Sequence, residues 1–234
     1  MRHVLVLTLL CFSIQCTPLQ QAAGNFPNSS ANYQGQQKIV EGLKQALTIG
    51  TQNSTNKLSA VNGFFADAAI KILMPPEAQD VEKTLRRFGL GSLVDKTILS
   101  LNRAAEDAAK SATPIFVNAI KQMTINDALG ILKGGDFAAT NYFKQKTTAD
   151  LTQAFSPVIS KSLNKVDATK YWSDVFTAYN RFSTKKVETD LTAYVTQKAI
   201  DGIFYEVGLE EQKIRKDPAA RVTDLLKQVF GGNQ

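Results

Sequence analysis

Apolar side chains recur at helical spacing through most of this chain. One stripe starts at Val94 and ends at Ala112, advances in steps of four and three residues, and consists of alanine in its second half. A second stripe starts at Leu191 and ends at Val207, in steps of four. Positions three and four apart lie on one face of an α-helix, so each stripe predicts an amphipathic helix with one buried side.

Capping signals divide the pattern into separate helices. Thr124 stands three residues before Asp127, as in a capping box. Thr113 precedes a proline, which is typical of an N-cap, and Gly89 is expected to end a helix. The run Lys133-Gly134-Gly135-Asp136 is expected to end one helix and cap the next.

The fold class follows from this pattern. No stretch of the sequence alternates convincingly between apolar and polar residues, as a half-buried strand would. Pro157 falls inside a helical run and is expected to kink or split it. We therefore predict an all-α fold, with one bundle-like domain of about eight to ten helices over residues 38–234.

The first 37 residues have a different character. A short basic start leads into an apolar run over residues 4–14, which as a helix would span about 16 Å, roughly half the hydrocarbon core of a bilayer. That length is too short for a membrane anchor and is typical of a secretory signal peptide. Residues 17–37 carry no charge and almost no apolar side chains, so we expect a disordered polar tether there.

Cys16 follows the apolar run at the place where a lipoprotein carries its acylated cysteine. Gln15 departs from the small residue that usually precedes such a cysteine, and cleavage after Ala22 or Ala23 is the alternative. A cysteine with several acyl chains would hold the chain at a membrane. We predict residues 1–16 as signal peptide and lipidation region, with an exported product that is periplasmic or membrane-anchored, facing the periplasm or the cell surface.

Histidine and cysteine are confined to this predicted leader. The only histidine is His3, and the two cysteines are Cys11 and Cys16. The predicted mature body therefore lacks the side chains for Ser-His-Asp or Cys-His catalysis, for His or Cys zinc sites and for internal disulfides. We assign no catalytic, metal-binding or cofactor-binding residue, and expect no cofactor.

The chain is basic, with a net charge of +6 and a pI near 9.2. Its charges are interspersed, and the longest basic runs are the pairs Arg86-Arg87 and Lys185-Lys186. A solvated surface explains this distribution, and attraction to anionic phospholipid is the alternative. Nucleic acid is not an expected partner, because it would need a concentrated basic patch.

Three pairs match the Ser-x-x-Lys spacing of some serine hydrolases: Ser54/Lys57, Ser162/Lys165 and Ser183/Lys186. Their companion motifs are missing, because Ser173-Asp174 is not followed by asparagine and the sequence has no Lys-Thr-Gly. A hydrolase using Ser162 and Lys165 remains an alternative, as does one using a pair of carboxylates.

The carboxylates of residues 206–211 are most simply explained by ion pairs on a helix surface rather than by catalysis. Glu206, Glu210 and Glu211 crowd one helical stretch with basic residues, and Glu211 and Arg215 have the i,i+4 spacing of surface ion pairs. We expect a solvated helix face there. Arg103 is different, because it flanks the small-residue stripe and is expected to form a partly buried ion pair with Glu106 or Asp107.

Four aromatic doublets are expected to anchor the core, and lining of an apolar ligand pocket is their alternative role. They are Phe64-Phe65, Tyr142-Phe143, Tyr171-Trp172 and Phe204-Tyr205.

Several segments resemble one known family, domain of unknown function 4197. They include Gly42-Leu43-Lys44-Gln45-Ala46-Leu47, Leu101-Asn102-Arg103-Ala104-Ala105-Glu106, residues 119–147 and residues 194–231. The resemblance covers essentially everything after the predicted tether. It implies an exported helical protein of bacteria, and it carries no activity, cofactor or catalytic residue.

Three hypotheses of function follow. The first is a non-enzymatic envelope lipoprotein that binds or scaffolds an unknown protein or lipid partner, tethered to a membrane by its anchor. The second is a helical carrier of an apolar ligand such as a lipid, which predicts a continuous apolar cavity behind the aromatic doublets. The third is a hydrolase without histidine.

Overall fold

The computed structural model describes residues 29–165, residues 172, 177, 180 and 181, residues 190–217 and residue 227. Within these residues the chain forms seven α-helices and one 3-10 helix, and no strand. In chain order they are α1 (Ser29–Ser59), η1 (Pro76–Ala78), α2 (Gln79–Arg87), α3 (Gly91–Ala109), α4 (Ala112–Gln122), α5 (Ile125–Lys133), α6 (Ala138–Asn164) and α8 (Leu191–Lys216). The all-α prediction is confirmed.

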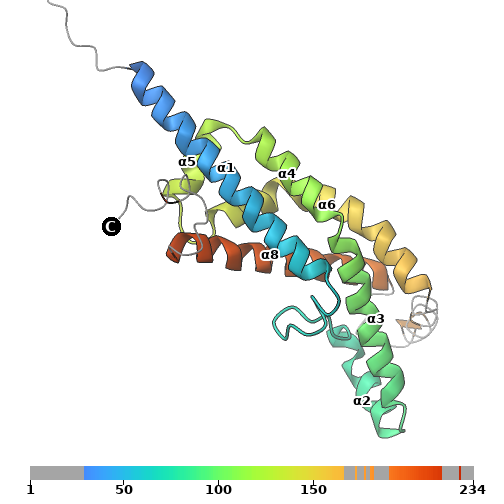
Figure 1. The fold of residues 1–234 in the computed structure, drawn as a ribbon. Coiled ribbons are helices and arrows are strands. Elements are labelled where there is room, and N and C mark those ends of the chain that lie inside the picture. The colour runs from blue at the N-terminus through green and yellow to red at the C-terminus, as the bar shows by residue number, and fades with distance from the viewer. Residues whose placement is uncertain are drawn as a thin grey trace, which may run out of the picture.

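The long helix α8 lies at the centre of the packing and contacts α6, α1 and α3 (Figure 1). Helix α6 also packs on α3, and α4 lies against both α1 and α6. Of the helices described, none combines the length and the apolar character needed to cross a bilayer.

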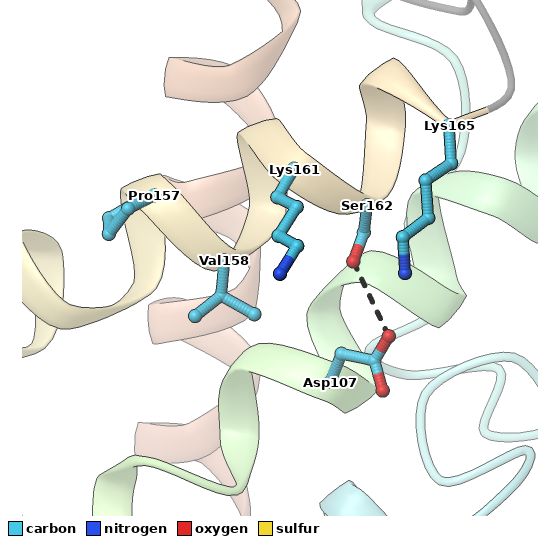
Figure 2. A pocket seen from close by; sticks show the side chains of 6 residues that line it. All are labelled: Asp107, Pro157, Val158, Lys161, Ser162 and Lys165. Carbon is cyan, nitrogen blue, oxygen red and sulfur yellow. Dashed lines mark hydrogen bonds between the residues drawn. The ribbon is translucent and has the colours of Figure 1, made fainter.

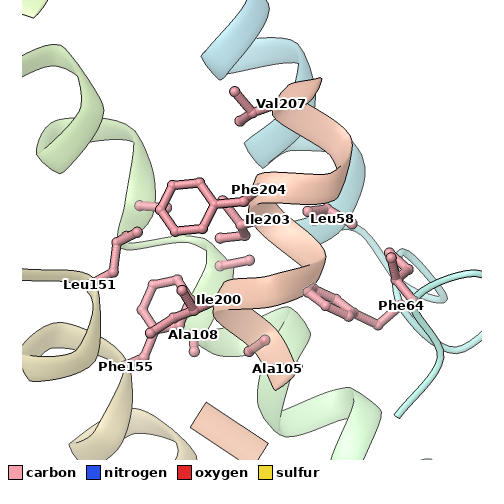
Figure 3. Close-up of a cluster of buried hydrophobic side chains, with 14 of the residues drawn as sticks. Leu58, Phe64, Ala105, Ala108, Leu151, Phe155, Ile200, Ile203, Phe204 and Val207 are labelled. Atoms are coloured by element: carbon pink, nitrogen blue, oxygen red, sulfur yellow. The ribbon is translucent and has the colours of Figure 1, made fainter. Parts of the chain in front are cut away.

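The two predicted stripes form the core of the bundle. Every position of the stripe that starts at Val94 and every position of the stripe that starts at Leu191 is buried. Figure 3 shows Ala105 and Ala108 of α3 in one cluster with Ile200 of α8. The small side chains let the helices approach, and the larger ones on α8 fill the space between them.

Two of the predicted helix boundaries are confirmed. At the start of α5, Asp127 N–H donates to Thr124 Oγ1 at 3.1 Å and Thr124 N–H donates to Asp127 Oδ2 at 3.0 Å, which completes the capping box. After α2, Gly89 has a φ of +79°, a conformation that glycine adopts without strain.

Thr113 does not cap α4, so that prediction is wrong. The helix begins one residue earlier, at Ala112, and Pro114 lies in its first turn, where a missing N–H breaks no helical hydrogen bond. The Thr113 hydroxyl instead lies 2.7 Å from Thr55 Oγ1 and joins α4 to α1.

Asp136 does not cap α6 either. That helix begins at Ala138, and the residue before it, Phe137, forms no side-chain cap. Asp136 pairs with Lys216 at 2.7 Å, close to the end of α8. Glu211 of α8 accepts the first amides of α6 in its place, as described below.

Two further differences concern helix length. Helix α1 begins at Ser29, so residues 29–37 of the predicted tether are helical. Extending a helix that is already packed requires no new nucleation, which explains why these polar residues continue it. Pro157 lies inside α6 and does not split it, because the helix is continuous over 27 residues.

Candidate functional site

The Ser162/Lys165 pair lines an open hollow of about 430 Å³ between the ends of α3 and α6 (Figure 2). Asp107 faces it from α3, and Lys161 and Val158 face it from α6. The structure thus places this predicted pair at a surface depression with two further charged groups, Asp107 and Lys161.

The hydrogen bonds in this hollow do not activate the serine. Ser162 Oγ donates to Asp107 Oδ2 at 3.4 Å rather than to Lys165. The carboxylate of Asp107 also accepts from Lys110 Nζ at 2.8 Å, and this hydrogen bond is the main cause that lowers the pKa of Asp107 below its ordinary value. A nucleophilic serine needs its proton directed at a base, and an ionised carboxylate already bound to lysine is a weak one.

The second Ser-x-x-Lys pair, Ser54 and Lys57, forms structural contacts of α1. Ser54 Oγ is buried and donates to Gly50 O within the helix. Lys57 Nζ reaches Glu206 at 2.6 Å and Asp67 at 3.4 Å, and the hydrogen bond to Glu206 is the largest cause that raises the pKa of Lys57. The third pair, Ser183/Lys186, lies outside the described residues.

The carboxylates of α8 are not a solvated face, which corrects the sequence-based prediction. Glu206 and Glu211 are both buried, and only Glu210 of the three is partly accessible. Positions 207 and 214 are apolar and buried, so the face that carries Glu211 turns into the bundle. The ion pair that the i,i+4 spacing of Glu211 and Arg215 predicts is present, but Glu211 is buried rather than solvated.

Glu211 holds the start of α6. Its two carboxylate oxygens accept the amides of Ala139 at 2.9 Å and Thr140 at 2.8 Å, and also the Thr140 hydroxyl at 2.8 Å. Arg215 donates to the same carboxylate at 2.8 Å and to Ile131 O at 2.8 Å. A negative charge at a helix N-terminus is stabilised by the unpaired amides there, so this contact fixes α5, α6 and α8 to one another.

The long connection over residues 60–75 is held in the same way by α3. Glu106 accepts the amides of Phe64 and Phe65, each at 3.2 Å, and forms the predicted ion pair with Arg103. Asn102 is fully buried and bonds both the N–H and the C=O of Ile72, at 2.9 and 2.8 Å. These side chains satisfy backbone groups that a buried loop would otherwise leave unpaired.

Buried polar groups are therefore used for structure throughout the described chain. Among its buried side-chain oxygen and nitrogen atoms, Thr196 Oγ1 is the one without a hydrogen-bond partner. No group of three or more histidine, cysteine, aspartate or glutamate side chains gathers in that part of the chain in a way that could hold a metal ion. Cys16, the predicted lipidation residue, lies outside it.

One member of each aromatic doublet is buried in the core, as predicted, whereas Tyr205 is 44% exposed and Tyr142 lines a hollow between α4 and α6. Phe64, Phe143, Trp172 and Phe204 are buried. The ring of Phe116 lies edge-on to those of Phe143 and Phe204, with centroids 5.2 and 6.2 Å apart. Tyr171 lies outside the described residues.

Two smaller hollows bear on the carrier hypothesis. An apolar hollow beside Leu43 and Ile214 measures about 20 Å³, which has room for about one water molecule. A hollow of about 160 Å³ between α4 and α6 is lined largely by polar groups, among them Asn118, Asp127 and Lys146. Neither has the size and apolar lining that a lipid chain requires.

Exposed apolar side chains gather where α2 turns into α3. Phe88 is 79% exposed, Leu93 54% and Leu90 47%. We call Phe88, Leu90 and Leu93 the apolar tip. Helix α2 has no buried residue and packs mainly on α3 and η1, so the tip projects from the body at the lower right of Figure 1.

The turn at the apolar tip is closed by its own backbone. Leu90 N–H donates to Leu85 O at 2.9 Å, and Gly89 N–H donates to Arg86 O at 3.1 Å, which is the Schellman pattern. The sequence pattern predicts that Gly89 ends a helix, but it does not single out the residues beside this glycine. The available signal was a pair of large apolar residues around a turn glycine, next to Arg86-Arg87.

Comparison with known proteins gives one match, to a family model. No curated protein and no solved structure matches this chain. A family model described as "Protein of unknown function (DUF4197)" matches residues 34–231, which include nearly all of the residues that the structure describes. The chain therefore belongs to the DUF4197 family of proteins of unknown function.

Proposed function

We propose that this protein is an exported, membrane-tethered lipoprotein of the cell envelope that acts by binding or scaffolding rather than by catalysis. The export signal is the apolar run over residues 4–14, and the tether is an acylated Cys16. The protein faces the periplasm or the cell surface.

One observation carries the non-catalytic part of this proposal. Each buried charged or amide group described above is bound to a backbone group or an ion partner of the fold, as Glu211 and Asn102 are. Active sites instead direct such groups at a cavity where a substrate atom can sit. The one hollow that contains a predicted catalytic pair directs its serine at Asp107.

Mass spectrometry of the mature protein and cell fractionation test the tether. We expect the chain to begin at Cys16 with a diacylglyceryl group, and Cys16→Ser to move the protein out of the membrane fraction. Cys11→Ser is the matched control, because that cysteine lies within the apolar run and should leave lipidation unchanged. A mature chain that still begins at Met1 would refute export.

A serine-directed activity probe tests the absence of catalysis. We expect Ser162 to remain unlabelled, and Lys165→Ala to have no effect on labelling, because the serine hydroxyl is bound to Asp107. Labelling of Ser162 that depends on Lys165 would replace the binding proposal with the hydrolase.

A further inference from the structure

The turn that carries the apolar tip is suited to a medium with little water. The amides of Phe88, Gly89 and Leu90 all donate to carbonyls of α2, and the amide of Leu93 donates to Leu90 O. An unpaired amide is costly to move out of water, so the internal pairing of these four amides lowers the cost of inserting them into a lipid interface.

The apolar side chains of the tip are unusually accessible. Phe88 shares the highest exposure of any large apolar residue described, at 79%, with Val61 of the loop after α1. Phe88 and Leu90 flank the turn glycine, and Leu93 follows within the first turn of α3. The turn between α2 and α3 that carries these side chains lies at one end of the described helices (Figure 1).

Two cations next to the apolar tip lie outside the ion pairs of the hairpin. Lys83 pairs with Asp80, and Arg86 bridges Glu82 and Asp95 across the two helices. These ion pairs leave out Arg87, which adjoins Phe88, and Lys96, which lies one turn after Leu93. Cations beside inserted apolar groups are attracted to anionic headgroups.

From these three features we propose that the apolar tip is a membrane-contacting element, which inserts Phe88, Leu90 and Leu93 into the interface of an anionic lipid surface while Arg87 and Lys96 bind its headgroups. The proposal deepens the proposed function and rests on it for the presence of a membrane. The tip and the start of α1 lie at opposite ends of the described helices (Figure 1).

A local fluorescence probe tests this contact in the full chain. Both native cysteines are replaced by serine, and a single cysteine is introduced by Phe88→Cys and labelled with an environment-sensitive NBD dye. The matched control is Val61→Cys, which has the same exposure in a different loop. Each labelled chain is mixed with phosphatidylglycerol-phosphatidylcholine vesicles and with phosphatidylcholine vesicles.

We expect the dye at position 88 to shift to the blue and to brighten on the anionic vesicles, whereas the dye at position 61 keeps its aqueous spectrum. Removing one cation with Arg87→Gln should weaken the response at position 88 about fivefold, and added salt should weaken it further. Both chains carry the leader, so its own affinity for vesicles cancels in the comparison.

Two results would overturn the proposal. An aqueous spectrum at position 88 on every vesicle would show that the tip does not enter lipid, even if the leader binds. A blue shift that rises with protein concentration in the absence of vesicles would show that the tip is covered by a second copy of the chain. The chain used here has no Cys16, so either result leaves the lipidation test of the proposed function unaffected.

Discussion

The two ends of α3 contrast sharply. Its second half is buried, with Leu101, Ala105 and Ala108 packed against α6 and α8. Its first turn projects with α2 and exposes Leu93 beside Phe88. Burial of apolar surface stabilises a fold only where a neighbour excludes water, so the buried end accounts for stability and the exposed end is available to a partner.

The largest expected difference between these regions comes from two phenylalanines. Phe116→Ala should lower the free energy of unfolding by about 3–5 kcal/mol, because it removes a buried ring that contacts Phe143 and Phe204. Phe88→Ala should change it by no more than about 0.5 kcal/mol. Urea unfolding measures both, and a large loss for Phe88→Ala would mean that the tip belongs to the core.

The next effect concerns the buried carboxylate of α8. Glu211→Ala should cost about 3 kcal/mol of stability, because it leaves Arg215 and the first amides of α6 without their acceptor. Glu210→Ala is the matched control, and its partners Asn53 and Lys213 are accessible, so its cost should stay below about 1 kcal/mol. Equal costs in denaturant unfolding would contradict the structural role of Glu211.

Glycines extend the comparison at a smaller scale. A Cβ at Gly202 would lie 2.5 Å from Phe64 Cε1, so Gly202→Ala should destabilise the protein by about 1–3 kcal/mol. Gly130 lies in α5 with no atom near its missing Cβ, so Gly130→Ala should be neutral or stabilise by up to about 1 kcal/mol. The two melting temperatures should therefore move apart, and a shared direction would count against the packing of α8 on Phe64.

The smallest effect is a pH dependence at the start of α5. Hydrogen bonds from the Thr124 hydroxyl and amide lower the pKa of Asp127. A carboxylate whose folded pKa is lowered contributes stability above its unfolded pKa, near 3.9, and loses it as pH falls through the folded value. The stability difference between the parent chain and Asp127→Asn should thus be full at neutral pH and shrink below about pH 4. A stability difference that grows in acid would contradict a lowered pKa of Asp127 in the folded chain.

The sequence predicted the parts of the fold that depend on neighbours in the chain. The stripes of α3 and α8, the capping box at Thr124 and the turn at Gly89 were all read from spacings of a few residues. Each depends on the local geometry of a helix, which the sequence encodes directly.

Contacts between distant segments could not be predicted in this way. Glu211 caps a helix 72 residues away, and Asn102 binds a loop 30 residues away. Their sequence neighbourhoods look like ordinary helix surface, because nothing local shows which face another segment covers. The exposure of the apolar tip could not be predicted either, because the sequence does not show that Phe88, Leu90 and Leu93 are left uncovered by other segments.

One measurement tests the separation of stability from binding most directly. The double variant Phe88→Ser with Leu90→Ser is compared with the parent in urea unfolding and in the vesicle response of an NBD dye at Leu93→Cys, both in the full chain with its native cysteines replaced by serine. We predict a free energy of unfolding within about 0.5 kcal/mol of the parent and a clear loss of the blue shift on phosphatidylglycerol vesicles. An unchanged blue shift together with a large loss of stability would contradict the account.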